Sequence, residues 1–291
     1  MSESEPRRRP GGPGQGGRSA AGRDATGRPR SGERRGRPAP KDAREAAPRA
    51  AGRFPAGERG RRPRADELAL PPDVTPDQLD RAVWGELRSL PKQLAERVAG
   101  HLVAAGTLID TDPALASRHA MEARRLAARV AAVREAAGLT AYAAGRYAEA
   151  LTELRAARRL ADNPDVLPVM ADCERGLGRP ERALALLDHA DARRLDRAGR
   201  VELLIVAAGA RRDLGQPDAA VLTLEVPELH SGEAAEWTER LWYAYADALL
   251  AAGRRDEAIG WFEAVAAVDE DELTDAAERV EQLRSGPDAD A

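Results

Sequence analysis

Apolar positions in the last two thirds of the chain recur at helical spacing, and glycines interrupt them at a nearly constant interval. Residues 242–265 read WYAYADALLAAGRRDEAIGWFEAV, two apolar-periodic stretches separated at Gly253. Gly145, Gly178 and Gly215 divide similar pairs upstream, and successive separations are 33, 37 and 38 residues. A helix on each side of a tight turn, repeated about every 34 residues, predicts an all-α solenoid of helical hairpins.

Small and large side chains stand at fixed distances from these glycines. Alanine follows each glycine by five residues, a large apolar residue follows four further on, and a small residue precedes each glycine by seven. The three sets are Ala150, Ala183, Ala220 and Ala258; Leu154, Leu187, Leu224 and Phe262; and Gly138, Ala171, Ala208 and Ala246. Two helices approach within about 8–10 Å only where small side chains meet, so these positions predict the helix crossings. The glycine would end the first helix of each pair.

This pattern resembles the tetratricopeptide repeat (TPR), with its W-x2-L-G-x2-Y, A-x3-F and P signature. The fourth unit matches best, through Trp242, Tyr245, Ala246, Leu249, Ala258 and Phe262. The first unit contains GRYAEAL (145–151) and the second GRPERAL (178–184), whereas the third is weaker, with Arg211 at a usually apolar position. The resemblance covers 131–273 and implies a right-handed TPR-type solenoid. The chain also looks like actinobacterial TPR proteins with Arg/Gly/Pro-rich arms.

The resemblance implies a partner-binding groove on the first helix of each repeat. Carried onto this sequence, its groove positions are Glu135, Tyr142, Asp172, Arg175, Arg212, Arg240, Tyr243 and Asp247. The carboxylate clamp of chaperone adaptors needs Lys and Asn where this chain has Glu135 and Leu139, so we reject that partner. A mixed-charge groove with two tyrosines favours a protein or peptide segment carrying both charge and apolar anchors.

Further helices are expected on both sides of the four repeats. Residues 67–130 predict a degenerate repeat: TPDQ (75–78) has a capping-box pattern, and DP at 112–113 opens another helix. A helix-turn-helix DNA reader over 75–106 is the less favoured alternative. Residues 274–284 predict a polar capping helix, and 285–291 a frayed tail.

The first 66 residues differ from the rest in composition. From Ser2 to Glu67 there is no Leu, Ile, Val or Met, so a disordered tail is expected. Residues 1–64 hold 18 basic and 7 acidic side chains (net +11), and the remainder has net −15. Ten arginines could contact nucleic-acid phosphates without base specificity; they are Arg7, Arg8, Arg9, Arg34, Arg35, Arg37, Arg59, Arg61, Arg62 and Arg64. Contact with the acidic remainder, or a purely solvating tail, are the alternatives.

The sequence gives no support for catalysis, a metal or a cofactor. Four scattered histidines lack zinc-protease spacing, and the lone Cys173 on a repeat helix favours a packed thiol. The acidic run VDEDE (268–272) favours a solvated cap over a metal site, and the aromatic residues of 237–262 favour core over a ligand cage. No signal sequence or membrane-length apolar run is present, so we expect a cytoplasmic protein without a membrane partner.

Three functional hypotheses follow. The favoured one is a non-enzymatic scaffold or adaptor that binds a partner segment in the groove. The alternative is an RNA- or DNA-associated protein whose tail contacts phosphates while the repeats recruit partners. A third is autoinhibition, in which the basic tail covers the acidic repeats until a partner displaces it. Sequence alone specifies neither the partner nor the oligomeric state.

Overall fold

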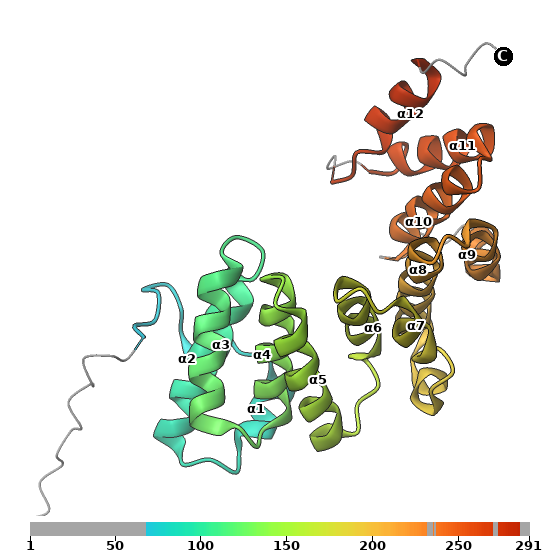
Figure 1. Cartoon of the computed structure of the whole chain (residues 1–291). Coiled ribbons are helices and arrows are strands. Elements are labelled where there is room, and N and C mark those ends of the chain that lie inside the picture. The colour runs from blue at the N-terminus through green and yellow to red at the C-terminus, as the bar shows by residue number, and fades with distance from the viewer. Residues whose placement is uncertain (1–67, 232–234, 236, 270–272, 286–291) are drawn as a thin grey trace, which may run out of the picture. The chain divides into compact units, whose positions relative to one another are not determined.

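The described part of the chain is all-α, with no strand among residues 68–231, 235, 237–269 and 273–285 (Figure 1). These are the residues that the computed structural model describes; the tail predicted for 1–66 and the end of the chain from 286 lie outside them. The α-helices are α1 (Arg81–Leu87), α2 (Lys92–Leu108), α3 (Pro113–Ala127), α4 (Ala131–Ala143), α5 (Tyr147–Ala161), α6 (Leu167–Gly176), α7 (Pro180–Ala185), α8 (Arg197–Asp213), α9 (Pro217–Leu224), α10 (Thr238–Ala251), α11 (Arg255–Ala266) and α12 (Ala276–Ser285). Short 3-10 helices span Pro76–Gln78, Ala190–Arg194 and Pro227–His230.

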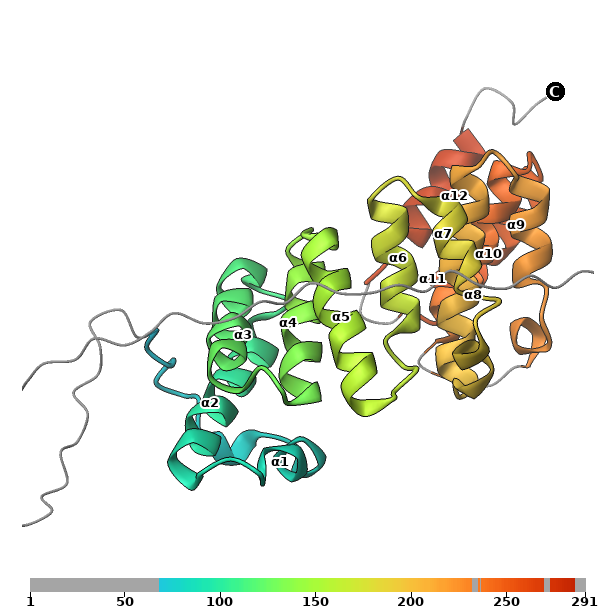
Figure 2. The same cartoon turned by 60° about the horizontal axis from the view of Figure 1, so that its bottom comes forward.

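Neighbouring helices pack as hairpins, and the hairpins pack on one another. The pairs α4–α5, α6–α7, α8–α9 and α10–α11 are the four predicted repeats, and α2–α3 pack in the same way upstream (Figure 1). First helices also contact one another, since α6 contacts α4 and packs against α8, and α8 packs against α10. Figure 2 shows α6 beside α8. Residues 68–285 therefore contain the TPR-type helical-hairpin solenoid that the sequence predicts.

The four periodic glycines end the first helices as predicted. Their φ values lie between 67° and 76°, in the left-handed region that side chains disfavour. After each glycine, the next backbone N–H donates to the carbonyl five residues back, as from Arg146 to Ala141 at 2.8 Å and Arg254 to Leu249 at 2.9 Å. This is the hydrogen bond of a Schellman motif, so one turn geometry recurs four times.

The small residues lie at the helix crossings. The four alanines that follow the glycines are fully buried, and Ala171, Ala208 and Ala246 are at most 2% exposed. In the first repeat the contact leaves no room for a side chain: a Cβ placed on Gly138 would lie 2.6 Å from Leu154 Cγ and 3.2 Å from its backbone nitrogen. Close packing at these crossings thus explains the spacing of small residues in the sequence.

The second repeat departs from the expected pattern. Leu187, expected on its second helix, lies beyond the end of α7 at Ala185 and is half-buried. The chain instead turns into the 3-10 helix Ala190–Arg194, whose start is capped by the His189 side chain. Arg158 on α5 pairs with Asp191 at 3.0 Å, which anchors this turn to the preceding repeat.

Two upstream helices begin where the sequence predicts, the 3-10 helix at Pro76 and α3 at Pro113, whereas α1 begins at Arg81, after the Asp80 cap. The Thr75 N–H donates to the Gln78 side chain at 2.8 Å, completing the capping box, and Asp112 accepts from the Leu115 N–H to cap α3. Glu153 of α5 is 2% exposed and pairs with Arg124 of α3 and Arg134 of α4. This buried carboxylate joins the upstream hairpin to the first repeat, and removing it would leave two arginines uncompensated.

Gly138→Ala tests the close crossing in the first repeat. The added methyl group would overlap Leu154, so we expect the free energy of unfolding to fall by about 1–3 kcal/mol in urea titrations. Gly260→Ala is the matched control, because nothing lies within 4 Å of a Cβ at that position within α11. The G260A substitution should raise the free energy of unfolding by about 0.5–1 kcal/mol. Equal effects of the two substitutions would contradict a steric role for Gly138.

Two buried histidines face each other between α2 and α3. The Nδ1 atoms of His101 and His119 are 3.0 Å apart, and the side chains are 3% and 1% exposed. Burial, and then the neighbouring His119, lower the pKa of His101 from 6.5 to about 4. Burial and Arg118 likewise lower the pKa of His119. The pair is therefore held in its neutral form, in which one ring donates to the other.

This pair should make the fold sensitive to mild acid. The unfolded chain binds protons at both histidines below pH 6.5, whereas folded His101 does so only near pH 4. Stability is thus lost as the pH falls from 6.5 to 4, by up to about 3 kcal/mol from His101. In denaturant titrations across this pH range, the free energy of unfolding should fall less steeply for the double variant H101Q/H119Q than for the parent protein. The exposed-site control H230Q should follow the parent protein, and identical curves for all three would refute the idea.

Candidate functional site

An open cavity of about 590 Å³ lies on the first helices of the later repeats, where the sequence places a groove. Small and aliphatic residues of α8 and α10 line part of it, and we call them the groove floor; they are Ile205, Ala208, Gly209 and Ala244. Charged and aromatic residues of α6, α8 and α10 also line the cavity, and we call them the groove wall; they are Arg175, Arg212, Arg240, Tyr243 and Asp247. Leu273, Thr274 and Asp275, which precede α12, complete the lining. We call this cavity the groove.

Side chains of the first helices link one repeat to the next along the groove. The Tyr142 hydroxyl on α4 donates to Asp172 on α6 at 2.6 Å, and Asp172 also accepts from Arg175 at 2.8 Å. Arg175 then donates through Nε to Asp213 on α8 at 2.9 Å. Its guanidinium lies against the backbone of Gly209, where a Cβ would be 2.5 Å from Arg175 Cζ. A glycine at this position therefore permits the link between α6 and α8.

A second set of links continues to the last helix. Arg212 on α8 donates to Asp247 on α10 at 2.9 Å, and the other Asp247 oxygen is 2.9 Å from Arg279 on α12. Arg279 also donates to the Tyr243 hydroxyl at 3.2 Å and lies over the Phe262 ring, 4.8 Å from its centroid. We call the two sets together the first-helix ladder. Apart from the Asp172–Arg175 contact within α6, each of these polar links joins two different helices, so the ladder connects α4, α6, α8, α10 and α12.

Burial and the ladder change the acidity of its tyrosines. Burial, and then the hydrogen bond to Asp172, raise the pKa of Tyr142 above its ordinary value. Burial and the hydrogen bond to Asp275 likewise raise the pKa of Tyr243. Both hydroxyls therefore stay protonated at neutral pH and act as hydrogen-bond donors to carboxylates.

Six of the eight predicted groove residues belong to the ladder, namely Tyr142, Asp172, Arg175, Arg212, Tyr243 and Asp247. A seventh, Arg240, lines the cavity but pairs with Glu202 at 2.6 Å, outside the ladder. Glu135 is separate: it is half-buried, and burial followed by the charges of Glu86 and Asp165 raises its pKa. Since no bound partner is described, the assignment of all eight as binding residues stays a prediction.

Other residues of the groove, the ladder and their ion pairs do not stand at repeat positions that would have identified them in the sequence. Glu202 and Asp213 complete ion pairs, and Leu273, Asp275 and Arg279 come from the segment around the start of α12. That segment follows no periodic glycine, so its residues could not be aligned with the repeats. An acidic residue 38 positions before Arg240, and another 38 after Arg175, are the only regularities that point to the two ion pairs.

The cysteine, the aromatic cluster and the acidic run lie in the core or in hydrogen-bonded turns. Cys173 is fully buried, and burial, then Asp172, raises the pKa of its thiol to about 12. Trp237, Tyr245 and Phe262 are at most 6% exposed in the C-terminal core. Asp269, from the acidic run, accepts hydrogen bonds from the Leu273 and Thr274 backbones. Among the described residues no group of three or more His, Cys, Asp or Glu is placed to hold a metal ion.

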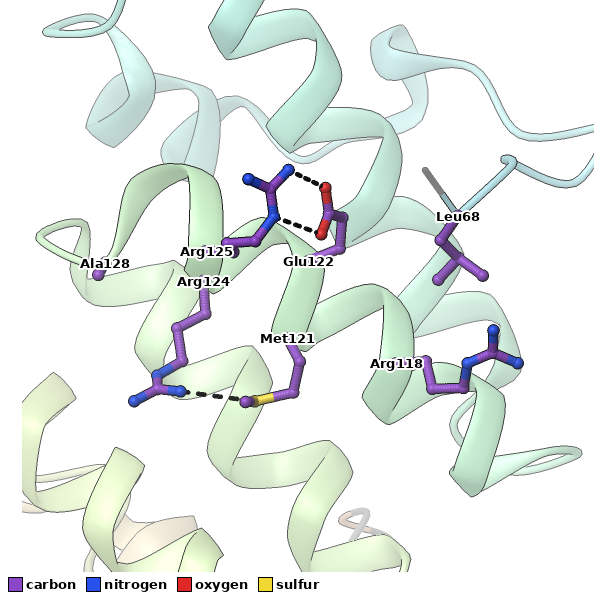
Figure 3. Close-up of a pocket in the computed structure, with 7 residues that line it drawn as sticks. All are labelled: Leu68, Arg118, Met121, Glu122, Arg124, Arg125 and Ala128. Carbon is purple, nitrogen blue, oxygen red and sulfur yellow. Dashed lines mark hydrogen bonds and ion pairs between the residues drawn. The ribbon is translucent and has the colours of Figure 1, made fainter. Parts of the chain in front are cut away.

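A second open cavity, over α3, does not form a convergent cationic site (Figure 3). Figure 3 shows the guanidinium groups of Arg118, Arg124 and Arg125 pointing in different directions. Arg125 makes a bidentate pair with Glu122, and Arg124 is 3.0 Å from Glu153. A phosphate at this cavity would therefore meet single arginines rather than a cluster.

The arginines predicted to contact phosphates, between Arg7 and Arg64, lie outside the described residues. The nucleic-acid hypothesis accordingly rests on sequence alone. Within the described residues, no helix is both long enough and apolar enough to span a lipid bilayer.

The fold and groove define an α-helical repeat solenoid of the TPR type. Among solved structures, yeast Tom70 is similar, with 18% sequence identity, a TM-score of 0.41, and coverage of 66% of this chain and 49% of that chain. The chain thus spans about half the length of that structure. No protein-family profile matches the sequence, and no curated protein matches it. The likeness to actinobacterial TPR proteins stays a prediction.

Asp247→Asn tests the ladder. Asp247 accepts from Arg212 and pairs with Arg279, so loss of its charge weakens two links between different helices. We expect the free energy of unfolding to fall by about 1–2 kcal/mol, measured by urea titration. Glu257→Gln is the control, because it weakens an exposed pair with Arg254 inside a single helical turn and should leave the midpoint unchanged. If the ladder does not stabilise the fold, the urea titrations of D247N and E257Q will be indistinguishable.

Proposed function

We propose that this protein is a non-enzymatic adaptor that binds a segment of a partner protein in the groove, and that it acts in the cytoplasm. One observation carries the proposal. The ladder holds α6, α8 and α10 together around an open cavity whose floor is made of small residues, with room for side chains from another chain. Helical-repeat proteins use such extended surfaces for binding.

The chemistry of the groove supports a protein ligand. It combines an apolar floor, guanidinium groups and a tyrosine whose ring packs on Phe262, with centroids 5.2 Å apart. Tyrosine and arginine are enriched at protein interfaces, where a rigid ring or fork gains contact area at little entropic cost. A segment of a partner can place an apolar side chain on the floor and polar groups along the walls.

Selection from a random peptide library tests the proposal. Peptides that bind the full-length protein should lose affinity when Ala244→Gln places a longer side chain on the groove floor. Ala251→Gln is the control, because Ala251 is exposed at the end of the same helix and lies outside the groove lining.

We expect about tenfold weaker binding to A244Q and unchanged binding to A251Q, measured by fluorescence anisotropy. Circular dichroism should show equal helix content in the two variants. If every selected peptide binds A244Q as tightly as the parent protein, the groove is not the binding site.

A further inference from the structure

The charged groups of the groove are not equally available to a ligand. Both carboxylate oxygens of Asp247 are engaged, one by Arg212 and the other by Arg279. Asp275 accepts from the Tyr243 hydroxyl. The acidic side chains of the groove wall therefore have hydrogen-bond donors from the protein itself, and a cationic ligand would have to compete with these contacts.

Arg212 and Arg240 each retain N–H donors that make no hydrogen bond within the described residues. Arg240 directs both Nε and Nη2 to a single oxygen of Glu202, and its side chain is 60% exposed. Arg212 donates to Asp247 through Nη1, and its side chain is 37% exposed. Within the described residues, Nη1 of Arg240 and Nε and Nη2 of Arg212 donate no hydrogen bond. A guanidinium has five N–H donors and no acceptor, so these groups suit a carboxylate.

An apolar position adjoins these donors. Leu273 is 79% exposed and lines the groove, facing solvent beside a floor that includes Ile205 and Ala244. Covering an exposed leucine with an apolar partner is favourable, because it removes apolar surface from water. The groove thus offers an apolar contact next to unused cationic donors.

We propose that the groove recognises an internal acidic segment of a partner protein, in which an apolar side chain is flanked by Asp or Glu. This inference rests on the proposed function and specifies its ligand. The apolar side chain packs on the groove floor and Leu273, while the flanking carboxylates bind Arg212 and Arg240. The protein's own residues 1–64 do not fit, since their net charge of +11 opposes the arginine side chains.

Three labelled peptides, acetylated and amidated at their ends, test the inference on the full-length protein. The first has a central leucine flanked by glutamates; the second replaces the glutamates with lysines; the third replaces the leucine with serine. The first should bind at least about tenfold more tightly than either of the others. Its affinity should fall as salt rises, because the contacts with Arg240 and Arg212 are partly exposed.

Matched variants localise the contacts. Arg240→Gln should weaken binding of the first peptide about fivefold, and Leu273→Ser should weaken it by about tenfold. Arg254→Gln and Leu222→Ser are the controls: Arg254 pairs only within its own helical turn, and Leu222 is 70% exposed on α9, outside the groove lining. Both should bind like the parent protein.

The outcomes separate the two proposals. If the lysine peptide binds best and A244Q weakens it, the groove binds peptides but the acidic specificity is wrong. If the first peptide binds and R240Q is without effect, the arginine contact is wrong. If the glutamate-flanked peptide binds only when its C-terminus is left as a free carboxylate, the proposal of an internal segment is wrong. If A244Q alters no peptide's affinity, the proposed function itself fails.

Discussion

Close contact between the two helices of each hairpin is the constraint on which the rest of the structure depends. A small residue on each helix lets the backbones approach, and a left-handed glycine reverses the chain just beyond the crossing. Larger side chains would separate the helices and expose the leucines that fill the space between hairpins. Gly138 shows the limit, since Leu154 already occupies the space that a methyl group at position 138 would need.

Polar contacts then determine how successive hairpins are joined. The ladder joins polar groups of side chains on the first helices, so the same residues can connect repeats and line a groove. Partly exposed ion pairs contribute little singly, yet Asp247 and Arg175 each make contacts with two other side chains. Because the acidic side chains of the groove already accept hydrogen bonds from the protein, whereas Arg212 and Arg240 retain unused donors, the stabilising network also biases recognition towards carboxylates.

The sequence predicted the helical hairpins because local rules determine them. Glycine with positive φ, alanine at a crossing and proline after an N-cap each act within a few residues. The course of the second repeat was missed, since α7 ends early through turn contacts of His189 and Asp191 rather than through a glycine or proline. Long-range ion pairs could not be predicted from the sequence either, because nothing near Arg279 along the chain indicates that it contacts Asp247 and Tyr243.

For the same reason, the sequence predicted which helices line the groove but not what the groove binds. All eight residues expected from the resemblance to TPR proteins lie on first helices, and five of them line the groove, whereas the exposed Leu273 and the unused donors of Arg240 emerged only in three dimensions. Recognition depends on which charges are already neutralised, and that depends on side-chain geometry rather than on residue type.

Hydrogen-exchange mass spectrometry of the full-length protein, with and without the glutamate-flanked leucine peptide, tests the central claim most directly. A groove built on the first helices predicts slower exchange on peptide binding in α8, α10 and residues 273–275, with α9 and α3 unchanged. Protection confined to α9, α3 or the first 67 residues, with none in α8 and α10, would contradict it.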